Sequence, residues 1–178
     1  MASTLQLVVP LKDLTGDPVE FDLRATTAER EELRRRFKLL DLQELAARGT
    51  IQPLKDGQGL RVSGHIAATL VQSCVVTLEP VTQRIDEDFQ LEFGDAGEVI
   101  EAASGEMVLL PDQEQPDPMP ATGLDVGGLV AEQLALAIDP YPRKEGADLQ
   151  EVLRRHGVKA EAGKPNPFAA LAALKSKG

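Results

Sequence analysis

The sequence predicts an α+β protein. It is expected to form an antiparallel β-sheet, or a partly open barrel, with an N-terminal helix, a helix after an acidic loop and an amphipathic C-terminal tail helix. Residues 59–93 alternate between apolar and polar side chains in two runs, which is typical of strands buried on one face. Residues 125–138 instead place apolar side chains three and four positions apart, the period of a helix that packs by one side. We expect one domain over residues 1–158, with an acidic loop at 94–124, and a linker with the tail helix over 159–178.

The central stretch is expected to hold two long antiparallel strands. Leu60 to Leu70 alternate in the first run, and Val81 to Phe93 alternate in the second. Between them lies an apolar run, residues 74–79, that ends at Pro80, where a strand loses a backbone donor. This run predicts a buried crossing segment in which Cys74 is a core residue.

The N-terminal part predicts two strands, a helix and a third strand. Residues 5–9 and 19–23 alternate on either side of a Gly-Asp-Pro turn, so they are expected to form an opening hairpin. Thr26 and Glu29 have the spacing of a capping box and begin a helix with a basic outer face. Residues 39–48 fit either period, whereas a strand near 48–54 is expected to pair with residues 59–71.

The C-terminal part predicts a loop followed by helices. Residues 94–123 are small, acidic and proline-rich, with a short strand expected at 106–110. Asp125 is expected to cap a helix that stops before Pro140, and a shorter helix should end near Gly157. Asn166 and Pro167 open the tail helix, which docks either on its own domain or on a partner.

Composition limits the location and the chemistry. A single cysteine excludes an internal disulfide and fits a reducing compartment. No apolar run approaches the roughly 20 residues that cross a bilayer, and the first residues resemble neither a signal nor a transit peptide. The sequence therefore predicts a cytoplasmic protein that does not enter a membrane. Aromatic residues make up only 3%, so few rings are available to stack on exposed bases.

The charges are segregated along the chain. The net charge is −10, and residues 85–142 contain no Lys, Arg or His but 14 acidic side chains between Asp86 and Asp139. The rest of the chain holds 19 basic and 15 acidic residues. We call residues 86–139 the acidic segment. It attracts basic partners and repels phosphate, unless it is only solvated surface.

Catalytic and cofactor signatures are missing from the sequence. A nucleophile needs a base within reach, but Cys74 is expected in an apolar strand, and His65 and His156 lie in unrelated settings. The glycines between Gly123 and Gly128 lack the lysine and the preceding strand of a phosphate-binding loop. One cysteine does not supply a zinc site, and the acids near 112–117 lack calcium-loop spacing. We expect a protein that is not an enzyme and has no cofactor or metal.

Three stretches resemble the YceD family of large ribosomal RNA subunit accumulation proteins. They are CVVTLEPV at 74–81 with its flanking strands, DVGGLVAEQLAL at 125–136 continuing to DPYPR at 139–143, and NPFA at 166–169, which is similar to the alphaproteobacterial branch. Many family members carry Cys-x-x-Cys-Leu-x-Pro, but Thr77 stands at the second cysteine here. A metal or redox role of other members therefore does not transfer to this chain.

The resemblance implies a non-enzymatic factor needed for 23S ribosomal RNA accumulation and large-subunit assembly. In one hypothesis the acidic segment binds a basic ribosomal protein or assembly factor of the large subunit. In another, basic residues bind 23S ribosomal RNA directly. A third alternative is a structural module without a partner surface, and the sequence does not predict an oligomeric state. The residues expected to contact a protein partner are Glu79, Pro80, Asp125, Glu132, Pro140, Tyr141, Pro142 and Arg143, with turns and caps as their alternative role. The expected RNA contacts are Arg34, Arg35, Arg36, Lys164, Lys175 and Lys177.

Overall fold

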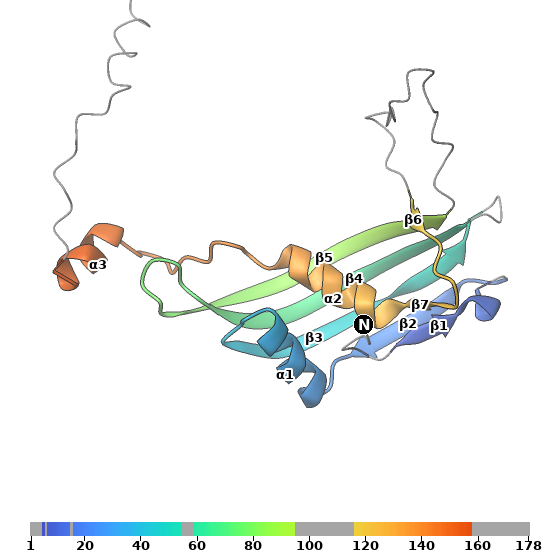
Figure 1. Cartoon of the computed structure of the whole chain (residues 1–178), viewed down its shortest axis with the longest axis horizontal. Helices are drawn as coiled ribbons and strands as arrows, with labels where there is room; N and C mark the ends of the chain where they lie inside the picture. Colours follow the sequence, from blue (N-terminus) through green and yellow to red (C-terminus); the bar gives the residue numbers. More distant parts are fainter. Residues whose placement is uncertain (1–4, 6, 15, 55–58, 95–115, 158–178) are drawn as a thin grey trace, which may run out of the picture. The chain divides into compact units, whose positions relative to one another are not determined.

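A computed structural model describes Leu5 and residues 7–14, 16–54, 59–94 and 116–157. Its elements alternate strands with a few helices and confirm the α+β class (Figure 1). They are β1 (Val8–Pro10), a 3-10 turn (Leu11–Asp13), β2 (Val19–Arg24), α1 (Thr27–Arg36), β3 (Asp41–Pro53), β4 (Gly59–Ser73), β5 (Pro80–Gly94), β6 (Asp117–Pro118), β7 (Gly123–Asp125), α2 (Val126–Ala137) and α3 (Leu149–Arg155). The strand expected at 106–110 and the tail helix lie outside the described residues.

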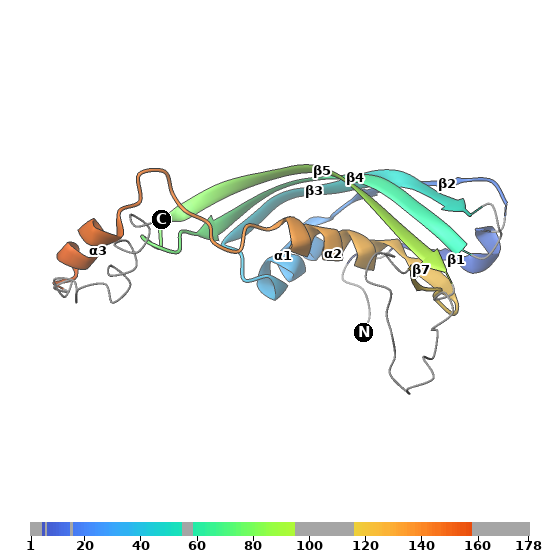
Figure 2. The same ribbon diagram turned by 90° about the horizontal axis from the view of Figure 1, so that it is seen from above.

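The main sheet has the strand order β2-β3-β4-β5-β6, and β1 and β7 form a separate two-stranded sheet. Strands β2, β3 and β4 pair antiparallel, whereas the two-residue β6 pairs parallel to the end of β5. Over the described residues the order has two ends, so this sheet does not close into a barrel. Helices α1 and α2 lie on the same face of the sheet (Figure 2).

The core lies between these helices and the sheet. Leu33 of α1 and Leu134 of α2 are fully buried, as are the sheet residues Ile51 and Leu70. Removing such apolar side chains from water is the main stabilising contribution. The helices begin where the sequence predicts, because Thr26 and Glu29 form the reciprocal capping box and Asp125 accepts a hydrogen bond from the N–H of Gly128 at 2.8 Å.

The prediction that the first two strands form an opening hairpin is wrong. β1 pairs with β7, with Val8 opposite Asp125, and β2 pairs with β3, with Val19 opposite Ile51. The 3-10 turn after Pro10 separates the first two strands, and each finds an antiparallel partner far along the chain. Local alternation identified β2 correctly but held no information about its partner.

Strand β3 explains why residues 39–48 fitted two periods. It begins at Asp41, and its pairing with β4 is interrupted by an irregularity between Leu42 and Glu44. This extra residue lets both Leu42 and Leu45 face the core, although they are three positions apart. The predicted pairing of the strand near 48–54 with residues 59–71 is confirmed.

The expected buried crossing segment at 74–79 is a surface loop. Leu78 is 77% exposed and Val75 is 47% exposed. Cys74 is fully buried, as expected, but it follows the end of β4 and does not belong to the main core cluster. The apolar run is short because it forms a turn between two strands. Apolar composition alone does not distinguish such a turn from a buried crossing segment.

The chain divides into two compact units. The larger is Met1–Gln72 with Thr82–Pro140, and the smaller is Ser73–Val81 with Tyr141–Gly178. The domain boundary expected at residue 158 stays a prediction. No helix in the described part of the chain is long and apolar enough to cross a membrane.

Candidate functional site

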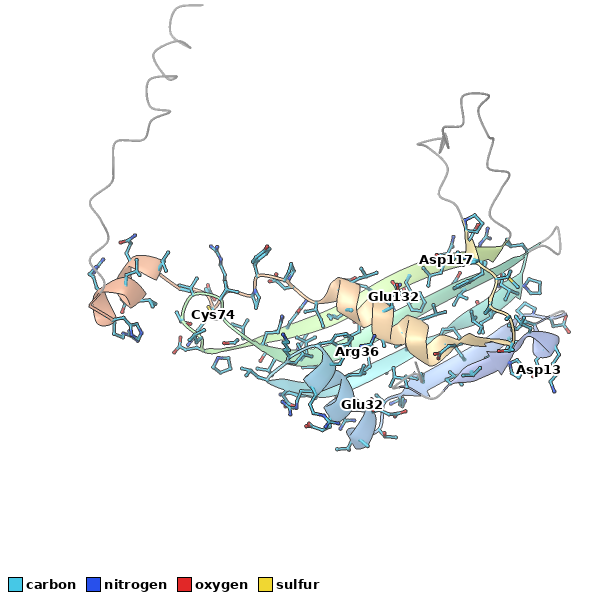
Figure 3. All side chains as sticks on the ribbon, in the orientation of Figure 1. Asp13, Glu32, Arg36, Cys74, Asp117 and Glu132 are labelled. Atoms are coloured by element: carbon cyan, nitrogen blue, oxygen red, sulfur yellow. The ribbon has the colours of Figure 1, made fainter. Side chains whose placement is uncertain are left out.

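The loop that joins β4 to β5 is a tight turn built around Cys74, which Figure 3 labels. The N–H of Cys74 donates to the carbonyl of Glu79 at 2.8 Å, and the N–H of Leu78 donates back to the carbonyl of Cys74 at 3.0 Å. Leu78 adopts a φ of 63°, a left-handed conformation that is uncommon for a leucine. The turn therefore holds an exposed apolar side chain on a strained backbone.

The sulfur of Cys74 is surrounded by backbone donors. The N–H groups of Lys144, Val76 and Thr77 point at Sγ, at 3.3, 3.4 and 3.4 Å. Hydrogen bonds to the ionised form favour it, so they lower the pKa of Cys74 to about 6, with the Lys144 N–H as the largest cause and Thr77 as the next. The turn thus stabilises a thiolate at neutral pH.

Residues 141–144 pack against this turn within the smaller unit. The N–H of Val75 donates to the carbonyl of Pro142 at 2.9 Å, and Lys144 Nζ lies 3.2 Å from Glu79 Oε2. This ammonium lowers the pKa of the Glu79 carboxyl. We call residues 74–79 and 141–144 the cysteine turn.

The cysteine turn, together with Pro80 directly after residue 79, contains five residues that the sequence singled out. Glu79, Pro80, Tyr141 and Arg143 are exposed there, whereas Pro142 is buried. Pro142 is therefore a packing residue of the turn, and the four exposed residues remain predicted partner contacts.

The described residues contain no group of three or more His, Cys, Asp or Glu side chains placed to hold a metal ion. Within the cysteine turn, Thr77 donates its backbone N–H to the sulfur of Cys74 at 3.4 Å. Backbone N–H donors, and no group of metal ligands among the described residues, thus surround the sulfur of Cys74 and stabilise its ionised form.

The other predicted partner residues lie in the larger unit. Asp125 caps α2 and is only partly exposed, so its structural role is established. Glu132 is exposed on α2 (Figure 3), and Pro140 is exposed after the helix ends. Asp139, just before Pro140, donates its N–H to the Gln83 side chain of β5 at 3.1 Å.

The described part of the acidic segment is densest in the middle of β5. Asp86, Glu87 and Asp88 are consecutive and exposed, and the side chains of Asp86 and Asp88 are 80% and 91% exposed. Both carboxylates contact the ring of His65 in β4, at 3.1 and 2.9 Å. The three carboxyl side chains lie at the solvent-exposed surface, where acidic groups attract cationic partners.

The expected RNA contacts on α1 are partly occupied within the protein. Arg34 makes a two-point ion pair with Glu31, with both N···O distances at 2.7 Å. Arg36 lies over the ring of Phe37, 5.5 Å from its centroid, and Arg35 is exposed. Lys164, Lys175 and Lys177 lie outside the described residues.

Neither the role of Lys144 nor the hydrogen-bonded environment of the Cys74 sulfur was predicted from the sequence. The spacing Cys74-x-x-Thr77 was the available signal, because a backbone N–H three residues after a cysteine reaches its sulfur in a tight turn. The third donor comes from 70 positions further along the chain, and no local pattern indicates it.

These features define a small α+β protein with a mainly antiparallel sheet, a cysteine turn and an acidic strand β5. The family model described as "Large ribosomal RNA subunit accumulation protein YceD" matches residues 62–175. The chain belongs to the YceD family, as the resemblance implied. Searches of curated proteins and of solved structures found no match.

The family description names a role in accumulation of large-subunit ribosomal RNA and names no catalytic activity. The matched range includes nearly all of β4, all of β5, the cysteine turn, the acidic segment and α2. Helix α1 and strands β1 to β3 precede it.

Proposed function

We propose that this protein supports 23S ribosomal RNA accumulation and large-subunit assembly without catalysing a reaction, by holding a basic ribosomal protein or assembly factor on its acidic segment in the cytoplasm. One observation carries the proposal. The acidic segment, which contains no basic side chain, lies entirely within the residues that match the family. A partner held there would be shielded from premature contact with RNA phosphates, since the acids occupy its cationic side chains.

The described acids are suitably placed for this task. Asp86, Glu87, Asp88, Asp117 and Glu132 are all exposed. Exposed charges of one sign increase the rate of encounter with an oppositely charged partner. They contribute little to folding, so a surface of this kind is better explained by a partner than by stability.

Direct RNA binding is the alternative. Arg35 and Arg36 are exposed on α1, and a basic helix face can contact phosphates. Two observations weigh against α1 as the main surface: Glu31 already occupies Arg34, and α1 precedes the matched residues. Lys164 and Lys175 lie within the matched range, so the tail remains the stronger basis for this alternative.

The test is capture of large-subunit proteins by the full-length chain after nuclease treatment. We expect basic ribosomal proteins to be retained, and to be lost when Asp86→Asn, Glu87→Gln and Asp88→Asn are combined. A matched control combines Glu20→Gln, Asp22→Asn and Glu44→Gln, which removes three exposed acids from the same sheet outside the acidic segment. Retention that requires intact RNA would contradict the proposal and support RNA binding.

A further inference from the structure

Within the described part of the chain, strand β5 has one edge that is free over most of its length. It is 15 residues long, but on its outer side only Phe93 and Gly94 pair, with Asp117 and Pro118 of β6. From Pro80 to Glu92 no described strand lies beside β5 on the side away from β4, and β5 forms the upper border of the sheet in Figure 1. Every second residue of such a strand directs its N–H and C=O away from the sheet, so the border offers a row of unused backbone donors and acceptors.

Side-chain hydrogen bonds and core packing fix strand β5 in place. The Gln83 side chain donates to the carbonyl of Ala137 at 2.8 Å and accepts from the N–H of Asp139 at 3.1 Å, which fastens β5 to the end of α2. Ile85 and Phe93 are buried in the core on the same face. A preformed strand loses little conformational entropy when another strand adds to it.

The charges of β5 select the kind of strand that can add. Natural proteins protect free edges with charged side chains, and here the middle of the edge carries Asp86, Glu87 and Asp88 with Arg84 as the only nearby cation in the strand. If two copies of this chain paired edge to edge in the antiparallel direction, these acids would lie close to their own counterparts. Like charges facing each other across strands are destabilising, so the edge rejects a second copy and favours a basic strand.

The opposite border of the sheet is a poorer candidate. Strand β2 has only six residues. Its exposed charges are Glu20, Asp22 and Arg24, so β2 carries fewer acids than the middle of β5, and Arg24 lies 3.9 Å from Asp22. It also precedes the residues that match the family.

We propose that the free edge of β5 binds an extended, lysine- or arginine-rich segment of a protein partner as an added β-strand. The inference rests on the proposed function and specifies how the partner is recognised: backbone pairing gives affinity, and cationic side chains directly beside Asp86 and Asp88 give selectivity. His65 lies between these two carboxylates, so an incoming cation competes with the ring for them.

The test compares two peptides of equal charge on the full-length protein. One is a short peptide that alternates lysine with valine or threonine, and the other has the same sequence methylated on every backbone nitrogen, which removes its strand-forming donors. We expect the unmodified peptide to bind and to slow hydrogen exchange of β5 amides, and the methylated peptide to bind at least about tenfold more weakly.

A pair of variants tests the same edge from the protein side. Glu87→Pro and Asp88→Pro each remove one carboxylate, but of two adjacent residues only one directs its N–H to the free edge. The variant that keeps the wild-type circular dichroism is the outward-facing one, because proline is tolerated at an edge. That variant should lose peptide binding at least about tenfold, whereas its partner should lose the fold.

Three outcomes would overturn the inference. They are equal binding of both peptides, protection of β2 amides in place of β5 amides, and absence of binding. Equal binding leaves the proposed function intact, since charge alone would then hold the partner. The capture of ribosomal proteins after nuclease treatment decides the proposed function separately.

Discussion

At the scale of single residues, Cys74 is the group whose chemistry the fold changes most. Three N–H groups on its sulfur, led by that of Lys144, lower its pKa from an ordinary value of 9.0 to about 6. Because Cys74 is the only cysteine, the ultraviolet absorbance of the thiolate reports it without interference from another thiol. We expect this absorbance to rise near pH 6 in the folded protein and only near pH 9 in denaturant. A single transition near pH 9 in both states would contradict the arrangement.

The same shift predicts how stability depends on pH. Between about pH 6 and pH 9 the unfolded chain keeps the thiol proton and the folded chain has released it. The unfolded state then binds more protons, so the contribution of Cys74 to stability rises with pH across this window and is lost as pH falls through 6. Denaturant titrations of the wild-type protein and Cys74→Ala should diverge towards pH 9 and converge below pH 6.

Asp125 separates a capping role from a contact role. Its carboxylate accepts the N–H of Gly128, so Asp125→Ala should lower the free energy of unfolding by about 1 kcal/mol. Asparagine is an equally good cap without the charge, so Asp125→Asn should change stability by only a few tenths of a kcal/mol. Denaturant midpoints measure both. If Asp125→Asn keeps its stability but loses captured ribosomal proteins, the carboxylate is also a partner contact.

At the scale of elements, the sheet depends on two glycines in its central strands. Gly49 of β3 lies opposite Gly64 of β4, and rings from the flanking strands cover both, Phe21 over Gly49 and Phe89 over Gly64. A β-carbon at Gly49 would meet backbone, including the Cα of Gly64 at 2.6 Å, whereas one at Gly64 would mainly meet the movable ring of Phe89 at 2.6 Å. Aromatic rings thus fill the space that the glycines leave.

This difference predicts that alanine at position 49 lowers the free energy of unfolding more than alanine at position 64. Gly49→Ala should lower the free energy of unfolding by about 2–3 kcal/mol, because backbone has to move. Gly64→Ala should cost less than about 1.5 kcal/mol, and adding Phe89→Leu should recover part of that loss by removing the ring contact. Thermal or denaturant unfolding of the three variants gives the comparison. Equal costs, or no coupling between positions 64 and 89, would show that the rings do not pack on the glycines.

The elements that the sequence predicted are those whose signals are local. Thr26 with Glu29 and Asp125 marked the two helix starts, and the alternation from Leu60 to Leu70 marked β4. The end of α1 was less visible, because Lys38 occupies the left-handed position that glycine usually takes, with a φ of 56°. The partners of β1 and β2 depend on packing between distant segments, so alternation did not reveal them.

At the scale of the whole molecule, the distribution of charge along the sequence predicted where exposed acidic side chains gather. The separation of the acids from the lysines and arginines is a property of the sequence, and the described acids on β5 and α2 are exposed as that reading requires. The cysteine turn shows the limit. Its chemistry arises because residues 74–79 and 141–144 meet, and only the fold brings them together.

The division into two compact units predicts that damage to the cysteine turn stays local. Cys74 does not belong to the main core cluster, which contains Leu33, Ile51 and Leu70. Cys74→Ala removes the acceptor of the Val76, Thr77 and Lys144 amides, so these should exchange hydrogen faster, while the amides of β3 and β4 keep their wild-type protection. Gly49→Ala is the converse control, since it should speed exchange in β3 and β4. Faster exchange throughout the sheet in Cys74→Ala would mean that the two units unfold as one, and the turn would then support the whole fold as well as its own loop.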